Sequence, residues 1–230
     1  MTSESPLVFL PGWGFQANIG REFLLGQTLF IDLPLHTNTS CIKTVCDLIE
    51  KKRLPNHCVL IGWSLGGLLS LKLYERNPNT YKALILITST PCFGTQKTWP
   101  GIPNEHQTIF KRMLATNYSV FFSYYLKVIS NAPNALKDHI IPQELFNGYK
   151  PYQNILFQSD LRSSFSRIQV PTLMIQGTED PIIPRNILSH LTALSPSLNY
   201  QAITGAGHIP FITHRIEIQK IISQFLTSTL

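Results

Sequence analysis

The sequence has 230 residues, of which 43% are hydrophobic and 14% are charged, and its formal net charge at pH 7 is +6. This length and composition indicate one globular domain with a full core, and they exclude disordered and fibrous proteins. The first residues lack the basic and apolar segments of a secretory signal, and no stretch approaches the roughly 18 uninterrupted apolar residues of a membrane helix. We therefore expect a cytoplasmic protein that does not act at a membrane.

The four cysteines, Cys41, Cys46, Cys58 and Cys92, form no Cys-x-x-Cys pair and have no histidine at zinc-finger spacing. Reduced thiols are therefore expected, with no metal ion and no organic cofactor. Residues 92–170 contain eight basic and four acidic side chains. An acidic partner could bind such a surface, although a solvated basic surface is the simpler interpretation. The charges neither form a run nor alternate with aromatic residues, so we expect no nucleic-acid partner.

The first predicted element is an apolar strand over residues 7–10, and the glycine-rich turn Pro11-Gly12-Trp13-Gly14 follows it directly. In α/β proteins that catalyse acyl transfer, a turn at this place supplies a backbone N–H to the oxyanion, and Trp13 is the best candidate. A second strand is predicted over residues 29–34. The apolar spacing of residues 41–49 then predicts a helix, with Thr39 or Ser40 as its N-cap.

The motif Gly62-Trp63-Ser64-Leu65-Gly66 lies between a predicted buried strand and a predicted helix. This is the sequence context of a nucleophile elbow, in which a serine hydroxyl is exposed on a sharp turn between two small residues. The backbone N–H of Leu65, at the start of the helix, can then face the developing oxyanion. A five-residue motif with three fixed positions also arises by chance, so the elbow needs partners to indicate an enzyme.

A continuous apolar strand is predicted over residues 83–88, and its alternation with helices indicates an α/β fold with a mostly parallel sheet of about six strands. No comparable strand follows until residue 168. We expect a helical cap over about residues 95–167, inserted at the carboxyl ends of the strands. Within it, residues 105–130 are predicted as one helix rich in aromatic residues, which would partly line the site and partly form the cap's own core.

The last two predicted strands, residues 170–176 and 198–204, are followed by loops that contain Asp180 and His208. The order Ser64, Asp180, His208 is that of the hydrolases built on this kind of sheet. His208 would act as the general base and Asp180 would orient it. Glu179 and His214 are the alternatives to these two residues. A terminal helix is predicted to turn four residues inward: Ile216, Ile221, Ile222 and Phe225.

The sequence resembles the pimeloyl-[acyl-carrier protein] methyl ester esterases of biotin synthesis, which belong to the α/β-hydrolase superfamily. The resemblance extends from about residue 7 to the last residue. It rests on these motifs: Gly12-Trp13-Gly14, Asp32-Leu33-Pro34, Gly62-Trp63-Ser64-Leu65-Gly66-Gly67-Leu68, Ser89-Thr90-Pro91-Cys92-Phe93, Trp99-Pro100-Gly101-Ile102 and Ala206-Gly207-His208-Ile209-Pro210-Phe211-Ile212.

The resemblance implies a monomeric carboxylesterase that frees pimeloyl-[acyl-carrier protein] from its methyl ester, with Ser64, Asp180 and His208 as the catalytic residues and Trp13 and Leu65 as the oxyanion donors. It further implies that the acidic carrier protein docks on the basic cap. The substrate would contact Trp13, Ser64, Leu65 and His208 together with a cap segment made of Tyr125, Leu126, Lys127, Val128 and Ile129.

Three features depart from the family pattern. Pro11 replaces the usual histidine before the oxyanion glycine, the leading antiparallel strands of the family are missing, and Val120 and Tyr124 lie where docking arginines are expected. Two other functions therefore remain open. One is a general short-chain carboxylesterase, thioesterase or acyltransferase with the same triad, and the other is a catalytically silent binding module.

Overall fold

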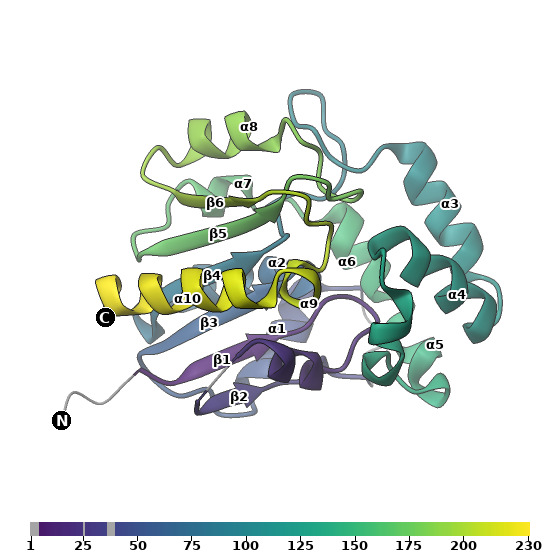
Figure 1. Cartoon of the computed structure of the whole chain (residues 1–230), viewed down its shortest axis with the longest axis horizontal. Coiled ribbons are helices and arrows are strands. Elements are labelled where there is room, and N and C mark those ends of the chain that lie inside the picture. Colours follow the sequence, from purple (N-terminus) through teal and green to yellow (C-terminus); the bar gives the residue numbers. More distant parts are fainter. Residues whose placement is uncertain (1–4, 25, 36–39) are drawn as a thin grey trace.

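The computed structural model describes residues 5–24, 26–35 and 40–230, and its centre is a six-stranded sheet. The strand order is β2-β1-β3-β4-β5-β6, and every neighbouring pair is parallel, as predicted (Figure 1). The predicted strands are all present, although the second is shorter than expected. Their bounds are Leu7–Leu10 for β1, Thr28–Phe30 for β2, Cys58–Trp63 for β3, Tyr81–Ile87 for β4, Thr172–Gly177 for β5 and Asn199–Ile203 for β6.

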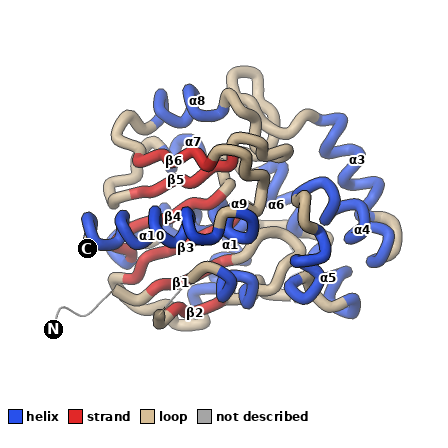
Figure 2. Tube along the Cα trace, viewed as in Figure 1, coloured by secondary structure: helices blue, strands red, loops and turns tan. Residues whose placement is uncertain are grey.

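Helices cover both faces of this sheet, which explains why the central strands are almost wholly apolar. Every residue of β3 is buried, and so is every residue of β4 except Lys82. The helices α1 (Ile42–Glu50) and α2 (Leu65–Arg76) lie behind the sheet in Figure 1, whereas α10 (Arg215–Thr229) crosses in front of it. The helix α8 (Ile187–Leu194) lies beside β6, and Figure 2 shows the strands enclosed between these layers.

The connections of the chain create a crevice between β1 and β3. From β1 the chain moves outward to β2, and it then returns to the other side of β1 to form β3. In a parallel sheet, the carboxyl ends of two strands whose connections diverge in this way form the usual ligand site. The two loops that open there are the turn after β1, which contains Trp13, and the turn after β3, which contains Ser64.

The segment between β4 and β5 lies at the carboxyl ends of the strands, where the cap was predicted (Figure 1). Its described helices are α3 (Asn104–Leu114), α4 (Tyr118–Ile129), α5 (Phe146–Tyr149), α6 (Tyr152–Gln158) and α7 (Arg162–Phe165), together with short 3₁₀ turns. The division of the chain into one domain with a cap over residues 95–167 stays a prediction.

The structure corrects three local predictions. Residues 105–130 form two helices, because Asn117 caps α4 by accepting a hydrogen bond from the Val120 N–H at 2.9 Å. The N-cap of α1 is Cys41 rather than Ser40, while Thr39 lies outside the described residues. On α10, Ile216 is 81% exposed, and Ile218 takes the inward position that the sequence analysis gave to Ile216.

Candidate active site

Ser64 lies on a strained turn between β3 and α2. Its backbone has φ 52° and ψ −116°, in the left-handed half of the φ range that residues other than glycine rarely adopt. The two glycines of the motif are required by close packing. A Cβ atom on Gly62 would lie 2.4 Å from the Gly66 carbonyl oxygen, and one on Gly66 would lie 2.1 Å from the Leu10 carbonyl oxygen. The elbow therefore fits against β1 only because both positions lack a side chain.

Ser64, His208 and Asp180 form a continuous chain of hydrogen-bond contacts. The Nε2 atom of His208 lies 3.0 Å from the Ser64 Oγ, and its Nδ1 atom lies 2.8 Å from the Asp180 Oδ2. Since a carboxylate only accepts hydrogen bonds, Nδ1 carries the proton and Nε2 is left to accept from the serine hydroxyl. This is the tautomer that lets an imidazole act as a base toward a serine.

The structure distinguishes the predicted residues from their alternatives. Asp180 and His208 are buried and paired with each other. Glu179 is exposed, and its backbone N–H donates to the Ala206 carbonyl oxygen. His214 is half-buried at the start of α10, where its Nδ1 contacts the Thr213 hydroxyl. The geometry of a serine–histidine–acid relay is therefore made by Asp180 and His208.

Asp180 is held by four donors, of which the sequence analysis named only His208. Its Oδ1 accepts from the N–H groups of Ile182 at 2.7 Å and Ile183 at 3.1 Å. Its Oδ2, besides facing His208, accepts from the Gln176 Nε2 at 3.3 Å. Gln176 is only 3% exposed. A glutamine in an otherwise apolar buried strand was a signal in the sequence, because buried polar side chains need a partner.

The two backbone N–H groups predicted to bind the oxyanion are those of Leu65 and Trp13, and this role stays a prediction. Leu65 is the first residue of α2, so its N–H is among those that a helix leaves without an internal acceptor. The Trp13 N–H belongs to the turn after β1. Neither group donates a hydrogen bond to another residue in the part of the chain that the structure describes. Pro11, at the start of the same turn, has no N–H and cannot serve as a donor.

The Trp13 side chain joins the sheet to the cap. The rings of Phe121, Phe122 and Tyr125 all pack on its indole, with centroids 5.2, 6.4 and 5.7 Å away. The indole Nε1 donates to the Tyr149 carbonyl oxygen at 3.2 Å, and the Tyr125 hydroxyl donates to the Trp13 carbonyl oxygen at 3.4 Å. The sequence analysis expected the aromatic side chains of this segment partly to line the site and partly to form the core of the cap, and the three on α4 all contact Trp13.

The tyrosine of this cluster stays a neutral donor. Burial first, and then the nearby charge of Asp180, raise the pKa of the Tyr125 hydroxyl well above its ordinary range. The hydroxyl therefore keeps its proton at neutral pH. It can hold the Trp13 carbonyl in place without adding a second negative charge near Asp180.

The cap segment predicted to contact the substrate divides into two faces. Tyr125, Leu126 and Ile129 are buried and Val128 is half-buried, whereas the Lys127 side chain is exposed. A cavity of about 200 Å³ opens between this end of α4 and the loops that carry Asp180 and His208. Its lining is Val128, Ile129, Ser130, Asn131, Glu179, Pro181, Gly205, Gly207, Ile209 and Thr213. Lys127 contributes nothing to it.

Within the described ranges, no three His, Cys, Asp or Glu side chains gather as metal ligands would. Cys46, Cys58 and Cys92 are buried. In the same part of the chain, no helix combines the length and the apolar character that crossing a membrane would require.

Comparison with known proteins identifies the family. Residues 44–215, three quarters of the chain, match the family of the α/β hydrolase fold. The chain belongs to the α/β-hydrolase family. This confirms the predicted fold and the predicted class of enzyme, a serine hydrolase that acts on esters.

Two named relatives are similar to this chain over nearly its whole length. The chain is 31% identical to the pimeloyl-[acyl-carrier protein] methyl ester esterase of Wigglesworthia glossinidia brevipalpis, over 96% of this chain and 93% of the relative. It is 27% identical to the protein of the same name from Proteus mirabilis, over 94% and 90%. The resemblance found in the sequence is thereby confirmed.

Solved structures support the same fold. An esterase from Exiguobacterium antarcticum superimposes with a TM-score of 0.81 at 18% identity, covering 99% of this chain and 93% of that one. An enol-lactonase from Burkholderia xenovorans LB400 gives a TM-score of 0.80 at 18% identity, covering 98% and 92%.

Proposed function

We propose that this α/β hydrolase is a carboxylesterase that cleaves the methyl ester of pimeloyl-[acyl-carrier protein] in biotin synthesis. The observation that carries the chemistry is the relay from Ser64 through His208 to Asp180, with contacts of 3.0 and 2.8 Å, buried beneath the cap. The similarity to the two named esterases supports the choice of substrate.

In the first half of the reaction, the Ser64 Oγ attacks the ester carbonyl carbon while the His208 Nε2 accepts the hydroxyl proton. The imidazolium that forms is stabilised by Asp180. The Leu65 and Trp13 N–H groups would donate to the oxyanion of the tetrahedral intermediate. The intermediate collapses when the carbon–oxygen bond to the methoxy group breaks, and the His208 proton converts the leaving group into methanol. An acyl-enzyme remains on Ser64.

In the second half, water takes the place of the serine hydroxyl. His208 accepts a proton from the water as it attacks the acyl carbon, and the same oxyanion donors stabilise the second intermediate. When the bond to Ser64 breaks, the proton returns to the Ser64 Oγ and the free carboxylate leaves. No cofactor is required, because water supplies the only additional atoms.

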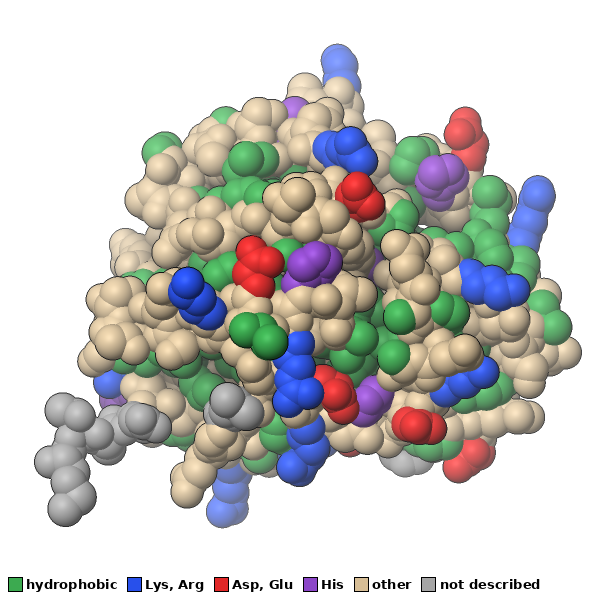
Figure 3. Space-filling view, viewed as in Figure 1, with side chains coloured by type: hydrophobic (Ala, Val, Ile, Leu, Met, Phe, Trp, Pro, Cys, Tyr) green, Lys and Arg blue, Asp and Glu red, His purple; other side chains and the backbone are tan. Residues whose placement is uncertain are grey.

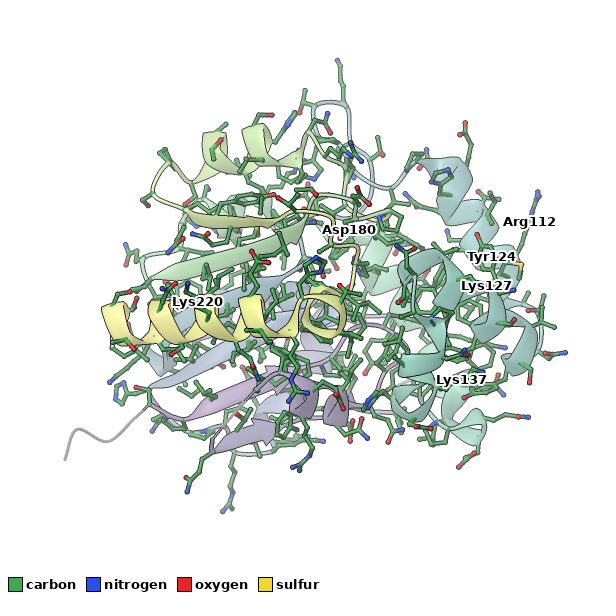
Figure 4. All side chains as sticks on the ribbon, viewed as in Figure 1. Arg112, Tyr124, Lys127, Lys137, Asp180 and Lys220 are labelled. Carbon is green, nitrogen blue, oxygen red and sulfur yellow. The ribbon has the colours of Figure 1, made fainter. Side chains whose placement is uncertain are left out.

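The carrier protein would dock on the outer side of the cap. Arg112 at the end of α3 and Lys127 on α4 are exposed, and so are the apolar side chains Val120 and Tyr124 of α4. Figure 4 labels Arg112, Tyr124 and Lys127 on this side of the molecule, and Figure 3 shows basic side chains around hydrophobic ones there. A surface with an apolar centre and a basic rim fits an acidic protein helix.

The cavity beside the triad is a route for the acyl chain. It lies between the carboxyl end of α4 and the two loops that carry the acid and the base, and Val128 and Ile129 form its apolar side. A dicarboxylic acyl chain would enter the cavity beside the loops of Asp180 and His208, while its other end stays attached to the carrier outside.

The test compares hydrolysis of the carrier-bound methyl ester with that of a p-nitrophenyl ester, using the wild type and Ser64→Ala. We expect the wild type to hydrolyse the carrier-bound ester strongly, with a loss of at least about 10³-fold in kcat for Ser64→Ala and no change in the unfolding midpoint. Wild-type activity on the p-nitrophenyl ester alone would instead indicate a general carboxylesterase. Activity on neither substrate would indicate a silent binding module, and full activity of Ser64→Ala would refute the mechanism.

A further inference from the structure

Thr88, directly after β4, has a backbone conformation that is rare for its residue type. Its φ is +41°, and a β-branched residue in the left-handed region is an outlier. The residue is completely buried. Strain of this kind persists only where the surrounding structure imposes it, and it concentrates at functional sites. The contacts of Thr88 show what the conformation achieves.

The Thr88 hydroxyl reaches across the molecule to the loop of the catalytic histidine. Its Oγ1 donates to the His208 carbonyl oxygen at 2.9 Å, and the Trp63 Nε1 donates to the same oxygen at 3.0 Å. The Thr88 N–H also donates to the Ile175 carbonyl oxygen on β5 at 2.8 Å. Two buried side-chain donors therefore hold the His208 carbonyl group in place.

The residues on either side of Thr88 fix Ser64 in the same way. The Ser64 N–H donates to the Ile87 carbonyl oxygen at 2.9 Å, and the Ser89 Oγ donates to the Ser64 carbonyl oxygen at 2.8 Å. Space for the Ser89 side chain exists because position 67 is glycine, where a Cβ atom would lie 2.4 Å from the Ser89 Oγ. The end of β4 thus contacts the main chain of both the nucleophile and the base.

We propose that Thr88 and Ser89 are positioning residues for the Ser64–His208 pair. Neither hydroxyl touches substrate. Each holds a backbone carbonyl of one reacting residue, and together they keep the Ser64 Oγ and the His208 Nε2 at the separation that proton transfer requires. This inference rests on the proposed function, because it assumes that these two residues perform the reaction.

A packing role alone does not account for the hydroxyls. Valine has the shape of threonine and would fill the same buried space, but it has no donor for the His208 carbonyl oxygen. A relaxed strand end would also avoid the strain at Thr88, and glycine would adopt φ +41° without cost. Position 88 instead has a threonine in a strained conformation, and its hydroxyl donates to the loop that contains His208.

The test measures kcat and KM on a p-nitrophenyl ester for Thr88→Val, Thr88→Ser and Ser89→Ala, with the unfolding midpoint of each variant. We expect kcat of Thr88→Val and of Ser89→Ala to fall about five-fold or more, with KM within about two-fold of the wild type, as for loss of one buried hydrogen bond. Thr88→Ser keeps the donor and should remain within about two-fold of wild-type kcat.

Thr90→Val is the matched control. Thr90 is also a buried threonine next to this segment, but its Oγ1 contacts the Cys92 carbonyl oxygen, and none of its hydrogen bonds within the described part of the chain reaches the triad. Its kcat should remain near that of the wild type. Thr88→Gly removes the hydroxyl and also removes the backbone strain, because glycine adopts a positive φ without cost. We expect it to unfold within a few degrees of the wild type and to lose as much kcat as Thr88→Val.

Three outcomes would overturn the inference: wild-type kcat in Thr88→Val, an equal loss in Thr90→Val, or no rescue by Thr88→Ser. If kcat falls only in proportion to the folded fraction, the role is structural and the inference is wrong. Ser64→Ala separates the two proposals. An inactive Ser64→Ala with an unaffected Thr88→Val refutes the positioning role alone, whereas an active Ser64→Ala refutes the proposed function.

Discussion

The rim of the sheet, which is the edge where its strands have their carboxyl ends, and the cap are built by different kinds of contact. At the rim, Ser64, Asp180 and His208 each follow a strand and are held by directional hydrogen bonds. Side chains distant in the sequence donate to the main-chain carbonyls of Ser64 and His208, and the Ile182 N–H donates to the Asp180 carboxylate. In the cap, aromatic rings pack around Trp13 with few polar contacts. Directional bonds set the geometry of a reaction, whereas apolar packing allows a surface to vary. The rim therefore fixes the geometry of the Ser64–His208–Asp180 relay, and we propose that the cap selects the substrate.

The largest expected effect tests the close packing at the rim. In Gly66→Ala the new Cβ would lie 2.1 Å from the Leu10 carbonyl oxygen, an atom of a central strand that cannot move aside. We expect a loss of about 3 kcal/mol in the free energy of unfolding and loss of esterase activity, measured by urea denaturation and initial rates.

Gly207→Ala is the control for this change, because its Cβ would lie 3.9 Å or more from the nearest atoms although the residue adjoins His208. Its free energy of unfolding should stay within about 0.5 kcal/mol of that of the wild type. Equal losses in the two variants would show that close packing does not explain the elbow glycines.

The second effect tests the joint between the sheet and the cap. Trp13→Ala removes the indole on which three cap rings pack and leaves a cavity, so we expect a loss of about 3 kcal/mol by urea denaturation. Tyr124→Ala, on the outer face of the same helix and 37% exposed, should cost less than about 0.5 kcal/mol. A small effect at Trp13 would mean that the cap is anchored elsewhere.

The third effect concerns the pH profile. In the wild type, the Gln176 amide donates to the Asp180 Oδ2. Gln176→Glu replaces this donor with a second carboxylate beside Asp180. The added negative charge favours a protonated imidazole, so the active neutral form requires a higher pH. We expect the acid limb of kcat/KM to move upward by about one pH unit.

Gln201→Glu serves as the control for charge alone, because Gln201 is exposed on β6. Its acid limb should coincide with that of the wild type. A shift of the same size in both variants would assign the effect to net charge instead of to contact with Asp180.

The smallest effect tests the outer surface of the cap. The double variant Arg112→Glu/Lys127→Glu should raise KM for the carrier-bound ester several-fold and leave the p-nitrophenyl ester unchanged, because rim charges act mainly on encounter. Lys220→Glu, on α10 and away from the cap in Figure 4, should change neither value. An unchanged KM for the carrier-bound ester in the double variant would remove the docking surface.

Local patterns were sufficient to predict the strands, the elbow and the three rim residues. The apolar runs of β3 and β4 identify buried strands, and the glycines at positions 62 and 66 identify a sharp turn. Each of the three residues follows a strand in a parallel sheet, and the carboxyl ends of such strands meet at one edge. The sequence by itself therefore determined the fold class and indicated Ser64, Asp180 and His208, whereas the structure was needed to choose Asp180 and His208 over Glu179 and His214.

The tertiary structure alone decided the features that depend on distant contacts. The convergence of three rings on Trp13, the hydrogen bond from Gln176 to Asp180 and the support from Thr88 to His208 join segments whose relative positions no local pattern encodes. The break at Asn117 depends on one cap hydrogen bond that competes with a continuing helix. Periodicity shows which side chains are buried, but the partner of each buried group is set by packing in three dimensions.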